Sequence, residues 1–179
     1  MAAFGQQEEY EKRLDWEILR SGSIALYWRQ QYLDEAVDWL RQHDYQVFTC
    51  DCEPWISEEA MHTGFQRTLS FPDYYGKNVN ALKDCLYDLP VPEVGGMALR
   101  LNRYDAYAKG TGTALMHSGR SEADVVLDIL ACASRHFLLT GRRFVTLVQS
   151  DDPHLAFEGL GGMAAQWNPR EWLNKNRGL

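Results

Sequence analysis

The stretch FPDYYGKNVNALKDCLYDL (residues 71–89) contains side chains that could bind a charged partner. Asn78 can accept hydrogen bonds from the first N–H groups of a helix that starts at Val79. Apolar residues then follow at helical spacing: Val79, Leu82, Leu86 and Leu89. This spacing predicts a helix over 79–89 that packs its apolar side on the protein core.

The opposite side of this helix is polar. Asn80, Asp84 and Tyr87 fall on successive turns of one face, and the loop Tyr-Tyr-Gly-Lys at 74–77 precedes it. Gly76 is expected to permit backbone angles that a side chain would forbid. Tyrosines give large, stiff contact area, and a carboxylate offers two acceptor oxygens to arginine or lysine. The pattern predicts an acidic binding patch rimmed by tyrosines. In the alternative interpretation, one tyrosine fills the core and Asp84 only makes the helix soluble.

The charge of the chain favours a protein partner over nucleic acid. The 179 residues carry a formal net charge of −7, whereas phosphate binding needs clustered lysine and arginine. Residues 51–93 hold eight acids and three bases, so their net charge is 3 − 8 = −5. Such a segment is either a solvated surface or suited to a basic partner, because complementary charge speeds encounter.

Strand and helix patterns alternate along the chain. Strands are expected at 23–28, 45–50, 97–102 and 144–148. Helices are expected at 6–20, 32–43, about 58–69, 79–89 and 122–137. This order predicts an α/β fold with a mainly parallel sheet. Residues 103–120 are interpreted as a loop, and residues 151–179 as irregular with one helical turn at 170–173.

The segment from Pro72 to Leu86 resembles the barstar family of ribonuclease inhibitors. The family's hallmark reads approximately P-x-Y-Y-G-x-N-hydrophobic-D-A-L-x-D-C-L. Ten positions coincide without a gap: Pro72, Tyr74, Tyr75, Gly76, Asn78, Ala81, Leu82, Asp84, Cys85 and Leu86. The resemblance covers residues 44–150 and implies a barstar-like parallel sheet of three to four strands with helices packed on it. Residues 1–43 would add an N-terminal helix and a βα unit, and residues 151–179 a C-terminal extension, within one compact domain.

The resemblance also implies inhibition of a ribonuclease by substrate mimicry. Asp84 matches the aspartate that the family places where the scissile phosphate would lie. Tyr74 matches a tyrosine that packs on the enzyme, and the backbone at Gly76 and Asn78 would lie close to it. The expected partner is a basic ribonuclease toxin, and the expected role is that of an immunity protein. The predicted contact residues are Tyr74, Tyr75, Gly76, Asn78, Val79, Asn80, Lys83, Asp84 and Tyr87.

Several positions depart from the family pattern, among them Tyr87 and Asp88, which replace smaller residues. Asn80 stands where the family has an aspartate, and Lys83 stands where tryptophan or another bulky residue is usual. Lys83 puts a positive charge beside Asp84, and the departures together imply a different target ribonuclease. The alternative is a module of the same fold that binds a partner other than a nuclease.

Other chemistry has weak support in the sequence. The cysteines have no zinc-ligand spacing, and Cys50 and Cys52 are expected to face one layer of the fold as reduced thiols. Gly110 and Gly112 lack the third glycine of a dinucleotide loop, and residues 151–154 favour a turn over a metal site. We therefore expect a protein that is not an enzyme and needs no cofactor or metal. No apolar run approaches the ~18 residues of a membrane span, and no secretion signal is evident, so a cytoplasmic location is expected.

Overall fold

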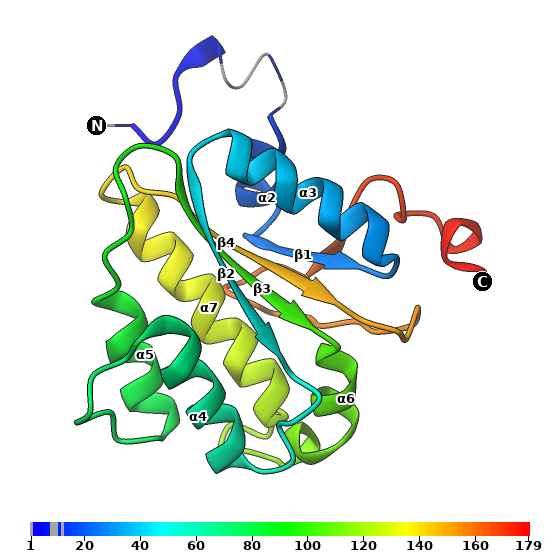
Figure 1. Cartoon of the computed structure of the whole chain (residues 1–179). Coiled ribbons are helices and arrows are strands. Elements are labelled where there is room, and N and C mark those ends of the chain that lie inside the picture. The colour runs from blue at the N-terminus through cyan, green and yellow to red at the C-terminus, as the bar shows by residue number, and fades with distance from the viewer. Residues whose placement is uncertain (1, 8–10, 12) are drawn as a thin grey trace.

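The computed structural model describes residues 2–7, 11 and 13–179. The fold is built on a five-stranded sheet in the order β2-β3-β4-β1-β5 (Figure 1). Every pair of neighbouring strands runs parallel. The strands are β1 (Ile24–Tyr27), β2 (Tyr45–Asp51), β3 (Gly96–Asn102), β4 (Phe144–Gln149) and β5 (Gln166–Trp167).

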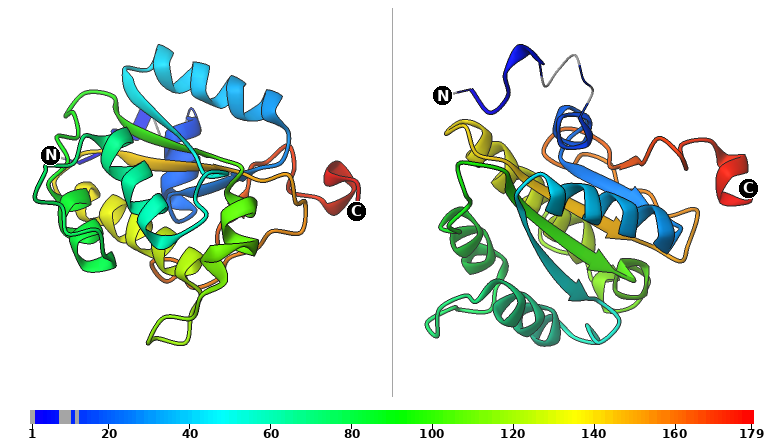
Figure 2. Two further views of the ribbon diagram at one scale, coloured as in Figure 1. Left: turned by 60° about the horizontal axis from the view of Figure 1, so that its bottom comes forward. Right: turned by 45° about the horizontal axis from the view of Figure 1, so that its top comes forward.

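Helices cover both faces of the sheet (Figure 2). One face carries α2 (Leu14–Arg20) and α3 (Gln30–Gln42). The other face carries α4 (Glu58–Leu69), α5 (Val79–Tyr87), α6 (Tyr104–Lys109) and α7 (Glu122–Leu138). Short 3-10 turns occur at Thr111–Thr113 and Asn174–Arg177. The predicted α/β class with a parallel sheet is confirmed.

Alternation along the strands divides the core into two clusters. On β3, Met97 and Leu99 pack with α4, α5 and α7, whereas Ala98 between them packs with α2 and α3. The neighbouring strand β4 is buried along its whole length, as the nearly unbroken apolar run at 144–148 predicts. Each fully buried Val, Leu, Ile, Phe or Met side chain in these two layers contributes about 1.5–3 kcal/mol, so burial on both faces holds the helices to the sheet.

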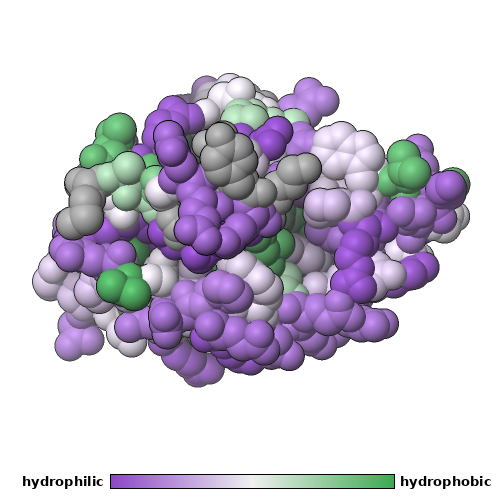
Figure 3. Space-filling model, turned by 90° about the horizontal axis from the view of Figure 1, so that it is seen from above, coloured by the Kyte–Doolittle hydropathy of each residue, from purple (hydrophilic) through white to green (hydrophobic). Residues whose placement is uncertain are grey.

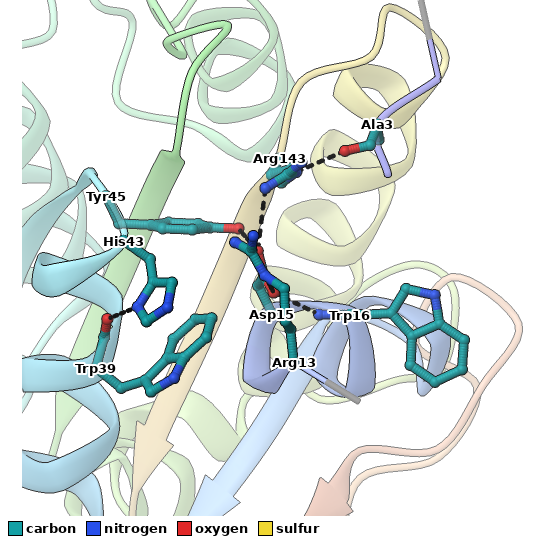
Figure 4. A network of polar contacts seen from close by, with 8 residues as sticks. All are labelled: Ala3, Arg13, Asp15, Trp16, Trp39, His43, Tyr45 and Arg143. Atoms are coloured by element: carbon teal, nitrogen blue, oxygen red, sulfur yellow. Dashed lines mark hydrogen bonds and ion pairs between the residues drawn. The ribbon is translucent and has the colours of Figure 1, made fainter. Parts of the chain in front are cut away.

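A buried carboxylate fastens α2 to the sheet (Figure 4). Asp15 Oδ2 accepts hydrogen bonds from Tyr45 Oη at 2.9 Å and from Arg13 Nη2 at 3.0 Å. Arg143 Nη1 approaches the same oxygen at 3.2 Å, and Arg143 Nε donates to the carbonyl of Ala3 at 2.7 Å. Because Tyr45 begins β2 and Arg143 directly precedes β4, the network holds the N-terminal segment against the start of both strands. A buried charge is tolerated when it is paired in this way.

The C-terminal extension adds the fifth strand. β5 pairs with β1, which itself pairs with β4. The buried Glu171 then accepts the backbone N–H groups of Trp28 and Arg29 at 2.9 and 2.8 Å. Glu171 therefore holds the backbone directly before α3, at Trp28 and at the N-cap residue Arg29. The two terminal extensions are therefore joined to each other.

Several details differ from the sequence-based predictions. The sheet has five strands where three to four were predicted, because the two-residue β5 is too short to show alternation. The helical turn near the C-terminus lies at Asn174–Arg177 and not at 170–173. Residues 103–120 include α6, a six-residue helix without a side-chain N-cap. The helix predicted over 6–20 is confirmed as α2 in its second half, and Tyr10 lies outside the described residues.

The surface seen from above Figure 1 is largely hydrophilic, with small separate hydrophobic groups (Figure 3). In the part of the chain that the structure describes, no helix combines the length and apolar character needed to cross a bilayer.

Candidate functional site

Asn78 fixes the start of α5. Its Oδ1 accepts hydrogen bonds from the backbone N–H groups of Asn80 and Ala81, at 3.1 and 3.0 Å. Its Nδ2 donates to the carbonyl of Gly76 at 3.0 Å. The predicted helix cap is confirmed, and the amide is occupied within the chain.

The turn before α5 has its left-handed residue at Lys77, with φ of 44°. Gly76 is not in that region of backbone conformation. A Cβ on Gly76 would lie 3.2 Å from Asn78 Nδ2 and 3.5 Å from the Cβ of Ala81. The prediction that Gly76 supplies unusual backbone angles is therefore wrong, because this glycine instead provides room for the Asn78 cap.

The side chain of Lys77 ties the loop to α4. Lys77 Nζ donates to Thr63 Oγ1 at 3.1 Å and lies 3.7 Å from a carboxylate oxygen of Glu59. Both partners belong to α4. The loop is therefore attached to α4 through Lys77, in addition to its attachment to α5 through the Asn78 cap.

Tyr74 and Tyr75 have opposite environments. The side chain of Tyr74 is 85% exposed, whereas that of Tyr75 is 5% exposed. The ring of Tyr75 packs against Phe71 at a centroid distance of 5.0 Å, and its hydroxyl hydrogen-bonds to His62 Nδ1. The ring of Tyr75, predicted as a contact residue, is therefore not part of the exposed surface. Of the two rings, that of Tyr74 is the one exposed to solvent.

Burial favours the neutral forms of His62 and Tyr75. Burial lowers the pKa of His62, while Glu58, 3.8 Å from His62 Nε2, opposes this effect. Burial also raises the pKa of Tyr75. The neutral imidazole can therefore accept the phenol proton at Nδ1, and the hydrogen bond supports the loop from beneath. His62 was not predicted, because nothing in the sequence connects it with a tyrosine thirteen positions later.

Asp84 lies on the exposed side of α5. Among the described residues, its carboxylate has no hydrogen-bond or ion-pair partner. The adjacent Lys83 forms no ion pair with it, and Lys83 Nζ lies 5.6 Å from the ring centroid of Tyr87. The other side chains of this surface differ in exposure: Asn80 is exposed, and Val79 and Tyr87 are half-buried.

Tyr87 connects α5 with α7. Its ring stacks on the exposed His136, with centroids 4.5 Å apart and planes 12° from parallel. His136 was also missed in the sequence, because the two helices are far apart in the chain and neither pattern indicates the contact.

Most acids of the segment 51–93 lie beside basic side chains. Asp51 and Glu53 pair with Arg103, Glu59 with Lys77 and Glu93 with Arg142, while Glu58 lies beside His62. The remaining three acids have no ion pair with a described residue: Asp73, Asp84 and Asp88. All three belong to the loop before α5 or to α5 and its end. Four acids of the segment thus have no cationic partner among the described residues: Glu58, beside the buried His62, and Asp73, Asp84 and Asp88, which belong to α5, its end and the loop before it.

The described residues show no sign of a metal or disulfide site. All four cysteines are free, and Cys50 and Cys52 lie in the same core cluster, as predicted for one layer. No group of three or more histidine, cysteine, aspartate or glutamate side chains among the described residues could hold a metal ion.

Comparisons with known proteins agree with this geometry. The family model described as "Barstar (barnase inhibitor)" matches residues 45–149, which is more than half of the chain and includes α5 and the loop before it. The protein named "Putative ribonuclease inhibitor YrdF" from Bacillus subtilis (strain 168) is 50% identical over 36 residues. That match covers 18% of this chain and 40% of the relative, so the chain spans less than half the relative's length.

A solved structure also overlaps with the chain, but the similarity is too low to indicate a relationship. It is titled "Structure of Drosophila ORC bound to AT-rich DNA and Cdc6", and it has a TM-score of 0.42 at 18% identity. The overlap covers 82% of this chain and 47% of the matched chain. The family match and the motif around Asp84 are the stronger findings, and on them the chain belongs to the barstar family.

Proposed function

We propose that this protein inhibits a ribonuclease by placing the Asp84 carboxylate in the enzyme's phosphate-binding position. The observation that carries the proposal is an exposed carboxylate without a partner among the described residues, on a capped and braced helix. A ribonuclease must stabilise the charge of the reacting phosphate with cationic donors. A carboxylate offers two acceptor oxygens to the same arginine, lysine or protonated histidine, so it competes with RNA.

The rigidity of the surface supports this role. Asn78 caps α5, Lys77 bonds to α4, and Tyr75 is anchored on His62. A contact surface that is already ordered loses less conformational freedom on binding. The exposed ring of Tyr74 precedes this anchored segment and can pack on the enzyme. The partner that fits best is a basic ribonuclease toxin, which makes the protein an immunity protein.

A second candidate is a module that binds a partner other than a nuclease. The neutral Asn80 and the cationic Lys83 favour it, because both reduce the negative charge around Asp84. The two candidate functions are distinguished by purifying the protein from its native cell together with its bound partner. The leading proposal requires that this partner cleaves RNA.

The leading proposal is tested by titrating barnase and purified ribonuclease domains of bacterial toxins with the protein. The variant Asp84→Asn should bind the inhibited enzyme more weakly by about 2 kcal/mol or more, which is roughly thirtyfold. Asp88→Asn is the matched control, because it removes the same charge from an exposed position one turn away. It should slow association moderately and leave the dissociation rate nearly unchanged.

Ionic strength gives a further readout of the same complex. Association should become slower as salt is added, because exposed charges are screened over about 8–10 Å at physiological ionic strength. Inhibition by Asp84→Asn that equals inhibition by the wild type would rule out phosphate mimicry.

A further inference from the structure

Lys83 has a favoured position on the proposed contact surface. Its ammonium lies over Tyr87 at 5.6 Å, and Tyr87 is stacked on His136 of α7. Lysine side chains on helix surfaces are usually mobile, but attraction to the face of an aromatic ring favours one position. The ring itself cannot swing away easily, because it is half-buried and packed against the core. We call these three side chains, Lys83, Tyr87 and His136, the cationic ledge.

The ledge and Asp84 form a surface with two separate charges. Asp84 and Lys83 are neighbours in the chain, yet no ion pair joins them or links either one to another described residue. Asp84 therefore stays available for a cation of the partner. Lys83 directs its charge along the helix toward Tyr87, at the C-terminal end of α5.

We propose that Lys83 selects which ribonucleases this protein inhibits, an inference that rests on the function proposed above. The selected class has a carboxylate on the rim of its phosphate-binding pocket, opposite the cationic ledge. An enzyme with only cations on that rim is rejected, because Lys83 meets a like charge when Asp84 is inserted.

Specificity between ribonucleases depends on repulsion as well as attraction. A partner is chosen by the difference between two affinities, and a repulsive contact with the wrong partner contributes as much as an attractive contact with the right one. Asp84 alone attracts every phosphate-binding pocket. The positive charge of Lys83 near Asp84 gives different affinities for two pockets that would bind Asp84 equally well.

The first test uses barnase, the ribonuclease named in the family description, and compares Lys83→Met with the wild type. Methionine keeps an unbranched side chain that can cover Tyr87 but has no charge. We expect Lys83→Met to bind barnase at least about tenfold more tightly. Lys83→Arg is the matched control, since it retains a cation over the ring and should bind as the wild type does. All three proteins should unfold at nearly the same temperature, because an exposed cation–π contact contributes little to the free energy of unfolding.

The second test places a carboxylate on the enzyme. Barnase variants with single exposed arginine or lysine residues changed to glutamate are measured by calorimetry, which does not require enzymatic activity. At least one variant should bind wild-type protein more tightly than it binds Lys83→Met, reversing the order seen with unmodified barnase.

The outcomes separate this inference from the proposed function. If Lys83→Met binds barnase no better than the wild type, or does not bind it at all, the role of Lys83 in selection is overturned. That role is also overturned if no glutamate variant of barnase binds the wild-type protein more tightly than it binds Lys83→Met. Introducing Asp84→Asn into Lys83→Met tests the underlying function. If the double variant binds as tightly as Lys83→Met alone, phosphate mimicry fails; if it binds more weakly, mimicry stands whatever the result for Lys83.

Discussion

At the scale of single residues, Tyr74 and Tyr75 show how adjacent identical side chains acquire different roles. The ring of Tyr74 is in solvent, whereas Tyr75 is enclosed by Phe71 and His62. Tyr75 holds the loop in place, and Tyr74 is available to a partner.

We predict opposite consequences for substitutions at these two positions. Tyr75→Phe keeps the ring but removes the donor to His62 Nδ1, which leaves a buried nitrogen unpaired. The free energy of unfolding should fall by about 1–3 kcal/mol, as measured by urea denaturation. Tyr74→Ala should change it by no more than about 0.5 kcal/mol while weakening ribonuclease binding. Equal losses of stability for the two variants would contradict this division of roles.

Sequence reasoning could place Asp84 but not Tyr75. The apolar spacing of Val79, Leu82 and Leu86 determines which side of the helix faces the core, so the exposure of Asp84 follows from it. The inward direction of Tyr75 depends on His62, a residue of another helix. No local pattern encodes such a contact, and the same holds for the stacking of Tyr87 on His136.

At the scale of elements, the start of α5 is fixed by Asn78, the N-cap residue that directly precedes the helix. Asn78 accepts two backbone N–H groups of the helix and also bonds to the preceding turn at Gly76. The cap therefore determines both where α5 begins and how the loop enters it. The residue is needed for the geometry of the site even though its amide is not free to touch a partner.

We predict that Asn78→Ala lowers the free energy of unfolding by about 1 kcal/mol, with a range of roughly 0.5–2 kcal/mol. Asn80→Ala provides the control, because Asn80 is exposed on the same helix and its side chain forms no hydrogen bond with a described residue. Chemical denaturation of both variants measures the difference. A loss for Asn80→Ala as large as that for Asn78→Ala would show that the cap is not the cause.

The elements that were predicted correctly carry strong local signals. Ser57 and Ser121 accept the backbone N–H groups of Ala60 and Asp124, so α4 and α7 begin where their sequences indicate. By contrast, α6 follows Arg103, which has a positive φ and provides no side-chain cap. The helix α6 depends on tertiary packing, here the burial of Tyr104 and other side chains. Its own sequence therefore does not predict it.

At the scale of the whole molecule, the terminal extensions enlarge the sheet on the side away from β2. β1 pairs with β4, and β5 pairs with β1, so both extensions lie beyond the strands of the matched family region. Glu171 joins them through the N–H groups of Trp28 and Arg29. Sequence comparison with the family could not show this, because the matched region begins at Tyr45 and ends at Gln149.

We predict that Glu171→Gln lowers the free energy of unfolding by about 1–3 kcal/mol, because an amide cannot accept both N–H groups with two oxygens and leaves one of them unpaired. Glu158→Gln is the matched control, since it makes the same change at an exposed position of the same extension. Thermal unfolding of both variants checks the expectation. Unchanged stability of Glu171→Gln would show that the carboxylate does not join the extensions.

The parallel pairing of β1 also has a consequence for how the chain acquires its structure. Ile24 of β1 lies opposite Thr146 of β4, and Ala25 lies opposite Gln166 of β5. During synthesis on the ribosome, β1 emerges first but meets both neighbours last. Contacts between distant parts of a chain form slowly, and an unpaired apolar strand is prone to aggregate while it waits. We therefore expect the apolar strand IALY to stay unpaired until the segments of β4 and β5 have been synthesised.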